Sequence, residues 1–176
     1  MSTQTKPRSL RPAVGFIWQH PAHFIALGFG SGLIYPAPGT WGTLMGVAMY
    51  PLILFGCKAI PMPLYAVVLA LCLLVFVLGC FCADRAGRAL GVPDHGSIVI
   101  DEIVAVWLVL LTVPATFTGW LAAFLAFRLF DILKPWPIRW LDRRVKGGFG
   151  VMIDDVLAAV FAIAALQGVQ LLLPLR

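Results

Sequence analysis

The sequence predicts an all-α, polytopic integral membrane helical bundle of four to five spans with an N-terminal interfacial or re-entrant segment. Of its 176 residues, 61% are hydrophobic and only 12% are charged, and the mean hydropathy is +0.94. Soluble domains carry about 25% charged residues, so this composition excludes an ordinary soluble protein. The length suits one compact bundle and is too short for two, and we expect a single membrane-embedded domain over residues 1–176.

The N-terminal residues 1–23 are predicted to form a cytoplasmic tail and an interfacial segment. Lys6, Arg8 and Arg11 precede an apolar run, 13–18, that ends at Gln19-His20-Pro21. This run is too short and too abruptly ended to be the apolar region of a cleavable signal peptide. We therefore expect the chain to begin at the cytoplasmic surface.

Five apolar stretches follow as candidate spans, at 41–56, 64–83, 98–113, 120–133 and 151–173. A helix that crosses the hydrocarbon core needs about 20 residues. The second and fifth stretches reach that length. The other three are short, so they must thin the bilayer, borrow flanking residues or lie packed inside the bundle. Four spans with one re-entrant segment is the alternative to five.

The connections between these stretches alternate in basic charge. The N-terminal tail, the loop after 64–83 and the loop after 120–133 are basic, whereas the second connection holds only Lys58 and the fourth, 114–119, has no charge. The positive-inside rule then places the N-terminus and the basic loops in the cytoplasm. The net charge of +5 mostly reflects this basic rim, which faces anionic headgroups, and calls for no nucleic-acid partner.

Six of the eight acidic residues lie near the ends of apolar stretches that this topology assigns to the cytoplasmic side. They are Asp94, Asp101, Glu102, Asp131, Asp154 and Asp155. Ionisable groups inside membrane segments are costly and usually functional. Carboxylates that meet without matching cations repel one another, and a hard divalent ion with oxygen ligands relieves the repulsion. The pattern therefore predicts a Mg²⁺ site with these six residues as ligands.

Basic residues beside the carboxylates are candidate phosphate ligands. Arg128, Asp131 and Lys134 are spaced three residues apart and share one helix face. We expect Lys134, Arg128 and Arg139 to contact a substrate phosphate. The alternative is that the acids only form buried ion pairs with Arg128, Arg139 and Arg143 that fix the packing of the helices.

Two glycine-rich segments and one histidine complete the set of candidates. The first segment, 28–42, ends at a predicted helix start, where Thr40 and free backbone N–H groups could bind an anion. The second, 147–150, is expected to be a hinge before Asp154. His95 could serve as a general acid or base, or as a polar cap on its loop. Asp84 has Arg85 and Arg88 as neighbours and is expected to form a surface ion pair.

Four blocks of sequence resemble the signature motifs of bacterial phosphatidylglycerophosphatase A. They are GFGSGLIYPAPGTWG (28–42), DHGSIVIDE (94–102), FRLFDILKPWPIRWLDR (127–143) and GGFGVMIDD (147–155). They follow in order and together are highly specific. The resemblance implies a Mg²⁺-dependent enzyme of the bacterial inner membrane that converts phosphatidylglycerophosphate to phosphatidylglycerol and phosphate in phospholipid biosynthesis. The family's acidic positions correspond to the six carboxylates above, with His95, Arg128, Lys134 and Arg139 alongside.

The chain lacks the DxDx(T/V) nucleophile motif of soluble phosphatases, and its CxxxxxR spacing, Cys82 to Arg88, begins inside the apolar stretch 64–83 and not in a loop. We therefore favour attack by a metal-activated water, with Asp101, Glu102, Asp131, Asp154 and His95 as the catalytic set. An aspartyl-phosphate on Asp101 or Asp154 remains the alternative. The expected partner is the membrane lipid substrate, and the sequence does not determine the oligomeric state.

Three other classes of protein fit the sequence less well. A small transporter would place polar groups near the bilayer midplane and often shows internal repeats, and neither is found here. A structural subunit would not need carboxylates in three spans at one depth. A CDP-alcohol phosphotransferase, the nearest chemical alternative, would carry a dense DG…AR…G…D…D motif, which is absent.

Overall fold

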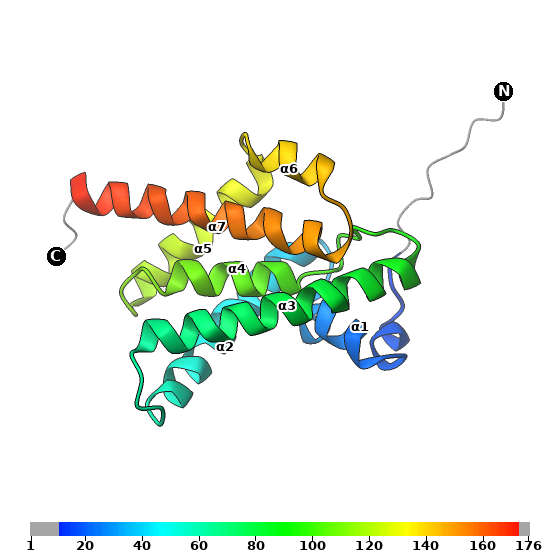
Figure 1. The fold of residues 1–176 in the computed structure, drawn as a ribbon, viewed down its shortest axis with the longest axis horizontal. Coiled ribbons are helices and arrows are strands. Elements are labelled where there is room, and N and C mark those ends of the chain that lie inside the picture. Colours follow the sequence, from blue (N-terminus) through cyan, green and yellow to red (C-terminus); the bar gives the residue numbers. More distant parts are fainter. Residues whose placement is uncertain (1–10, 173–176) are drawn as a thin grey trace.

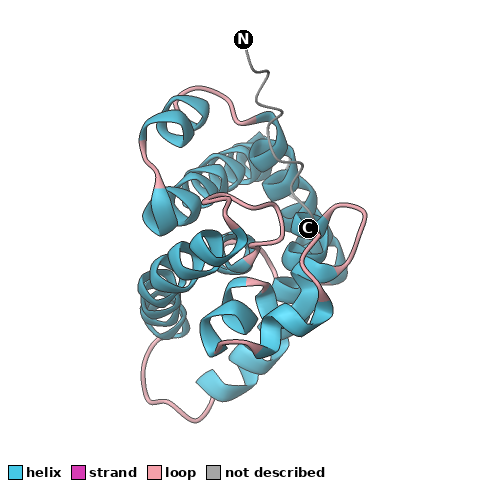
Figure 2. Cartoon of the chain, turned by 90° about the vertical axis from the view of Figure 1, so that its right-hand side faces the viewer, coloured by secondary structure: helices cyan, strands magenta, loops and turns pink. Residues whose placement is uncertain are grey.

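The computed structural model describes residues 11–172, and every regular element in this range is helical (Figure 1). In chain order the elements are η1 (Val14–Trp18), α1 (Pro21–Ala26), η2 (Gly28–Leu33), α2 (Pro38–Cys57), α3 (Leu64–Leu90), α4 (Ile100–Leu110), α5 (Phe117–Leu133), α6 (Ile138–Arg144) and α7 (Gly147–Leu172). Figure 2 shows loops joining the helices and no strand in the described range. The predicted all-α class is confirmed.

The short helix α4 forms the centre of the bundle. All of its eleven residues except Leu108 are buried, and it packs against α2, α3, α5 and α7. A helix that is apolar on nearly every side has no face to turn toward water, so burial is its stable arrangement. At 1.5 Å per residue it is only about 16 Å long and does not by itself cross a bilayer of about 30 Å. Packing inside the bundle was one of the three arrangements expected for the short stretch 98–113, and it is the one that the structure shows.

Three outer helices are long and apolar enough to cross a membrane: α2 with 20 residues, α3 with 27 and α7 with 26. Each exposes large apolar side chains away from the bundle, among them Phe55, Leu73 and Leu171. Such rows are unfavourable in water and suit contact with lipid. Helix α5 has 17 residues and also exposes leucines on its outer side. The count of four to five spans stays a prediction.

Successive helices of the bundle, from α2 to α5, alternate in direction, and α7 runs parallel to α4. Figure 1 shows α2, α4 and α7 running from right to left and α3 and α5 running back. The start of α4, the end of α5 and the start of α7 therefore meet at one end of the bundle, as the alternation of loop charges predicted. The segments η1, α1 and η2 lie at this same end, packed on α3 and α2, and α6 packs on α7 there.

The N-terminal segment exposes aromatic side chains at this end of the bundle. Trp18 is exposed and stacks on Phe24, which in turn meets Phe29 edge to face. Aromatic side chains of this kind are common at membrane interfaces. The assignment of 1–23 as tail and interfacial segment stays a prediction, and residues 1–10 lie outside the described range.

A glycine sets the distance between α3 and the start of α7. A Cβ atom at Gly148 would lie 1.7 Å from the carbonyl oxygen of Cys80, so the two backbones approach more closely than any side chain allows. Gly168, further along α7, has open space around it. The close approach brings the first turns of α7 over α4.

We expect Gly148→Ala to lower the thermal stability of the purified protein in detergent, by roughly 1–3 kcal/mol, because α7 must move off α3. Gly168→Ala is the matched control on the same helix and should raise stability by about 0.5–1 kcal/mol through helix propensity. Equal effects of the two changes on the melting temperature would show that the close approach is not needed.

The helix directions also predict the membrane topology. A reporter fused in the α4–α5 connection at 114–119 should be periplasmic, and one fused at 143–150 should be cytoplasmic, because these segments lie at opposite ends of the bundle. Alkaline phosphatase fusions, or the accessibility of each loop to added protease, measure on which side of the membrane the loop lies. If both fusions report the same side, α5 does not cross the bilayer.

Candidate active site

Carboxylates from α4 and α7 form a buried cluster at the end of the bundle. One oxygen from each of Asp101, Glu102 and Asp155 lies within 4.8 Å of the other two. All three residues are buried, at 9% exposure or less. This carboxylate triad unites two sequence blocks that are more than fifty positions apart, as the expected topology required.

The local structure of α2 and α4 explains how the triad is positioned. Asp101 and Glu102 occupy the first turn of α4, where the helix dipole favours negative charge. A Cβ atom at Gly39, near the start of α2, would lie 2.4 Å from the Oε1 atom of Glu102. A larger residue at this position would displace the Glu102 carboxylate from its place beside α2.

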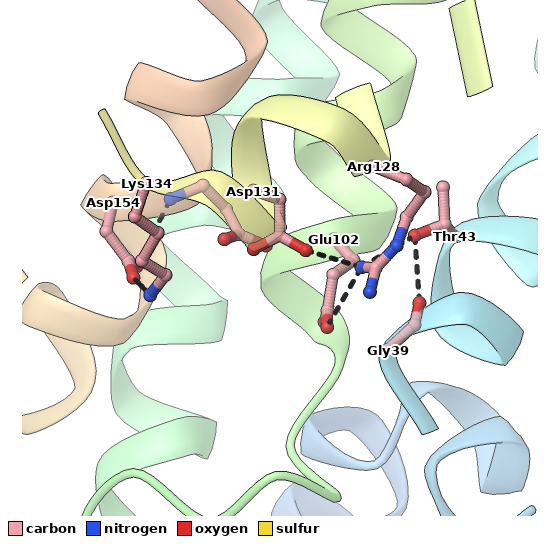
Figure 3. A network of polar contacts seen from close by, with 8 residues as sticks. Gly39, Thr43, Glu102, Arg128, Asp131, Lys134 and Asp154 are labelled. Carbon is pink, nitrogen blue, oxygen red and sulfur yellow. Dashed lines mark hydrogen bonds and ion pairs between the residues drawn. The ribbon is translucent and has the colours of Figure 1, made fainter. Parts of the chain in front are cut away.

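Arg128 neutralises one side of the cluster. Its Nη1 atom lies 2.6 Å from the Oδ2 atom of Asp131 and 3.9 Å from the Oε1 atom of Glu102 (Figure 3). It also donates to the hydroxyl of Thr43 at 3.5 Å, and that hydroxyl donates to the carbonyl oxygen of Gly39 at 2.8 Å. The network ties α5 to α4 and α2.

Lys134 neutralises the other side. It caps α5 with a positive φ of 41° and pairs directly with Asp154 of α7. Its Nζ atom also lies 3.9 Å from Asp142. Burial acts to lower the pKa of the Lys134 ammonium, but the charge of Asp154 acts in the opposite direction and the net pKa is raised. Lys134 therefore remains cationic at neutral pH.

These contacts divide the predicted metal ligands into two groups. Asp131 and Asp154 each already have a cationic partner, whereas Asp101 Oδ1, Glu102 Oε2 and Asp155 Oδ2 are buried without a hydrogen-bond partner among the described residues. Buried carboxylate oxygens left unpaired are strongly unfavourable. An all-oxygen donor set of this kind fits a hard divalent cation such as Mg²⁺.

Asp94 and His95 lie in the loop that leads into α4, outside the triad. Asp94 is exposed. His95 is buried, and its Nδ1 atom accepts a hydrogen bond from the backbone N–H of Ser97 at 3.1 Å. In the neutral ring the proton therefore sits on Nε2, which has no partner among the described residues. Their roles as metal ligand and general acid or base stay predictions.

Two predicted phosphate ligands, Thr40 and Arg139, and the expected surface acid, Asp84, each have a partner within the protein. Thr40 is partly exposed, and its backbone N–H, expected to be free for an anion, donates to the carbonyl oxygen of Ala37 at 3.0 Å. Arg139 is exposed and donates to the carbonyl oxygen of Leu133 at 3.1 Å, away from the carboxylates. Asp84 pairs with Arg88 at 2.5 Å on the surface, as expected.

Sequence reasoning missed Thr43 and Asp142. Thr43 is fully buried against Arg128, and the signal for it was a polar residue one turn after Thr40 inside an apolar stretch. Asp142 lies near Lys134, and the signal for it was its place in the sequence block 127–143. Of the ion pairs that the alternative expected, the described residues form two, from Arg128 to Asp131 and from Arg128 to Glu102, and none that includes Arg139 or Arg143.

Comparison with known proteins identifies relatives over most of the chain. The family model for phosphatidylglycerophosphatase A matches residues 24–170. A phosphatidylglycerophosphatase A of Haemophilus influenzae is 47% identical over 86% of this chain and 90% of its own length, and one of Escherichia coli is 42% identical over 81% and 80%. A putative phosphatidylinositol-3-phosphatase of Bacteroides thetaiotaomicron is 39% identical over 78% and 86%.

No solved structure matches the chain, so the helical arrangement rests on the sequence and the geometry described above. The match to the family model includes all four of the sequence blocks, and two named relatives carry the family's name. The resemblance seen in the sequence is confirmed: the chain belongs to the phosphatidylglycerophosphatase A family.

Proposed function

We propose that this chain is a Mg²⁺-dependent lipid phosphatase that converts phosphatidylglycerophosphate to phosphatidylglycerol and phosphate in phospholipid biosynthesis. It would act at the cytoplasmic face of the bacterial inner membrane. The family membership and the two named relatives support the substrate. The observation that carries the metal dependence is the triad of Asp101, Glu102 and Asp155, three buried carboxylates that bring one oxygen each within 4.8 Å of one another. Each of them also has a buried oxygen without a hydrogen-bond partner among the described residues.

The residues around the triad suit phosphoryl transfer. Asp101, Glu102 and Asp155 would hold Mg²⁺, which when bound would withdraw charge from the phosphoryl oxygens and activate a water. Arg128 and Lys134 lie on two sides of the cluster and would stabilise the charge of the transferring group. Asp131 and Asp154 would orient those two cations through their ion pairs.

The distribution of charge argues against transport. Helix α2 carries no charged residue, and the charged residues of α3, α4, α5 and α7 all lie toward one end of the bundle. A transporter would need polar groups near the bilayer midplane. A site at one end instead lies at the level of a lipid headgroup, which supports an enzyme acting on lipid phosphates.

The third relative suggests another metal-dependent lipid phosphatase activity as the second candidate. Phosphatidylinositol 3-phosphate and phosphatidylglycerophosphate both carry a phosphomonoester on a headgroup that is joined to the lipid by a phosphodiester. Phosphate release from purified protein against both lipids, with and without Mg²⁺, distinguishes the two. We expect the glycerol lipid to be the better substrate, because the relatives bearing that name are the more similar ones.

Substitutions should separate metal ligands from residues that orient cations. We expect Asp155→Asn to raise the Mg²⁺ concentration needed for half-maximal phosphate release by at least about tenfold, because a ligand is lost. Asp131→Asn should mainly lower turnover, because Arg128 loses its partner. Phosphate release measured over a Mg²⁺ titration tests both substitutions. Removal of the metal with EDTA should abolish activity in the wild-type protein and in every variant that retains activity.

A shift in Mg²⁺ dependence for Asp131→Asn as large as that for Asp155→Asn would place Asp131 among the ligands. In the metal-free form, Asp155→Asn should also raise thermal stability, because it removes a buried repulsion.

Lys134 should act on turnover. Lys134→Met is expected to lower turnover by roughly a hundredfold or more, equivalent to about 2–4 kcal/mol, because a charge-assisted contact made in the transition state is lost. Lys134→Arg should restore only part of the activity, since a planar fork does not replace a compact ammonium. Full activity of Lys134→Met at saturating Mg²⁺ would show that Lys134 only anchors the end of α5.

A further inference from the structure

A cleft of basic residues adjoins the carboxylate cluster, at the turn from α5 into α6. Its volume is about 440 Å³, in the range of small-ligand sites. The residues that line it are Lys134, Pro135, Trp136, Arg139, Trp140, Arg143 and Arg144. Four of these seven are cationic and none is acidic, so the cleft suits an anion.

Three arginines of the cleft are available to a ligand. None of the five ion pairs among the described residues includes Arg139, Arg143 or Arg144. Two of them are held in place: Arg139 donates to the carbonyl oxygen of Leu133, and the guanidinium of Arg144 stacks 4.5 Å from the centre of the Trp140 ring. Planar guanidinium groups that are oriented in advance bind phosphate oxygens well.

Lys134 connects this cleft to the carboxylate cluster. Its side chain lines the cleft, and its Nζ atom pairs with Asp154. Asp154 directly precedes Asp155 of the triad, so the pair of Lys134 with Asp154 links the cleft to the triad. This relation matches a ligand with two phosphates joined by a short link.

The walls of the cleft suit the membrane interface. Trp136 is 79% exposed and Trp140 is 47% exposed, while Ile138 of the same segment is fully buried. Exposed tryptophans beside arginines are typical of the headgroup level of a bilayer. This is the depth at which the phosphodiester of a phospholipid lies.

We propose that the cleft is a second anion subsite, which binds the phosphodiester of the lipid substrate while its terminal phosphate lies at the carboxylate cluster. The inference rests on the proposed function for the identity of the lipid. Arg143 and Arg144 then determine specificity for headgroup phosphates attached through a phosphodiester, whereas Arg128 and Lys134 contact the phosphate that reacts.

Direct binding of the product tests the cleft independently of turnover. Short-chain phosphatidylglycerol keeps the phosphodiester and lacks the terminal phosphate, and its binding to the full-length protein in neutral-detergent micelles can be followed by tryptophan fluorescence. We expect Arg143→Gln to weaken this binding about tenfold, the effect of one lost charge-assisted contact. Arg143→Lys should recover part of it, and helical content should be unchanged.

Lys146→Gln is the matched control. Lys146 is an exposed cation three residues further along the chain, and it does not line the cleft. We expect its replacement to leave phosphatidylglycerol binding at the wild-type value. Equal weakening by Arg143→Gln and Lys146→Gln would overturn the proposal and indicate a general attraction between the basic surface and anionic lipid.

A kinetic measurement distinguishes the subsite from the reacting phosphate. For phosphatidylglycerophosphate, Arg143→Gln should raise KM about tenfold, by a larger factor than it lowers kcat, because the contact is made equally in ground and transition states. Wild-type binding of phosphatidylglycerol by Arg143→Gln would overturn the subsite. A third outcome separates the two proposals. If Arg143→Gln weakens phosphatidylglycerol binding but the wild-type protein releases no phosphate from phosphatidylglycerophosphate, the subsite is supported and the proposed function is rejected.

Discussion

The structure depends on burying three carboxylates inside an apolar bundle. Asp101, Glu102 and Asp155 are enclosed by α4 and α7, and their charges repel one another strongly where the dielectric constant is low. The repulsion is relieved when a carboxylate takes up a proton or when a cation binds among the three. Arg128 and Lys134 are paired mainly with two other carboxylates, which leaves the triad suited to a divalent ion.

The rest of the fold can be understood as the means of bringing these groups together. A short central helix carries two of the acids in its first turn, where its dipole favours them. Glycines remove the side chains that would keep the neighbours apart: Gly39 lets α2 approach Glu102, and Gly148 lets α7 approach α3. The long outer helices then cover the cluster and present apolar side chains to lipid.

Two pairs of cations near the carboxylate cluster have different surroundings. Arg128 and Lys134 are partly buried and fixed by ion pairs, so they suit charge that develops during a reaction. Arg143 and Arg144 are exposed on α6 beside tryptophans, at the level expected for headgroups, so they suit binding of the lipid. One end of the bundle therefore combines the candidate active site with the proposed surface for its substrate.

The sequence by itself determined the class of the protein, because composition and apolar length depend only on the residues. It also predicted that Asp101, Glu102, Asp131, Asp154 and Asp155 would meet, because alternating spans bring the ends of distant segments to one membrane face. The family followed from four sequence blocks, which the comparisons confirmed.

Only the tertiary structure decided which carboxylates have a close cationic partner and which keep a buried oxygen without a hydrogen-bond partner, because that depends on side-chain distances of a few ångströms. It also showed that α4 is a buried core helix of eleven residues and that Thr43 supports Arg128. Hydrophobicity alone cannot distinguish a helix that faces lipid from one that faces other helices, since both surroundings are apolar.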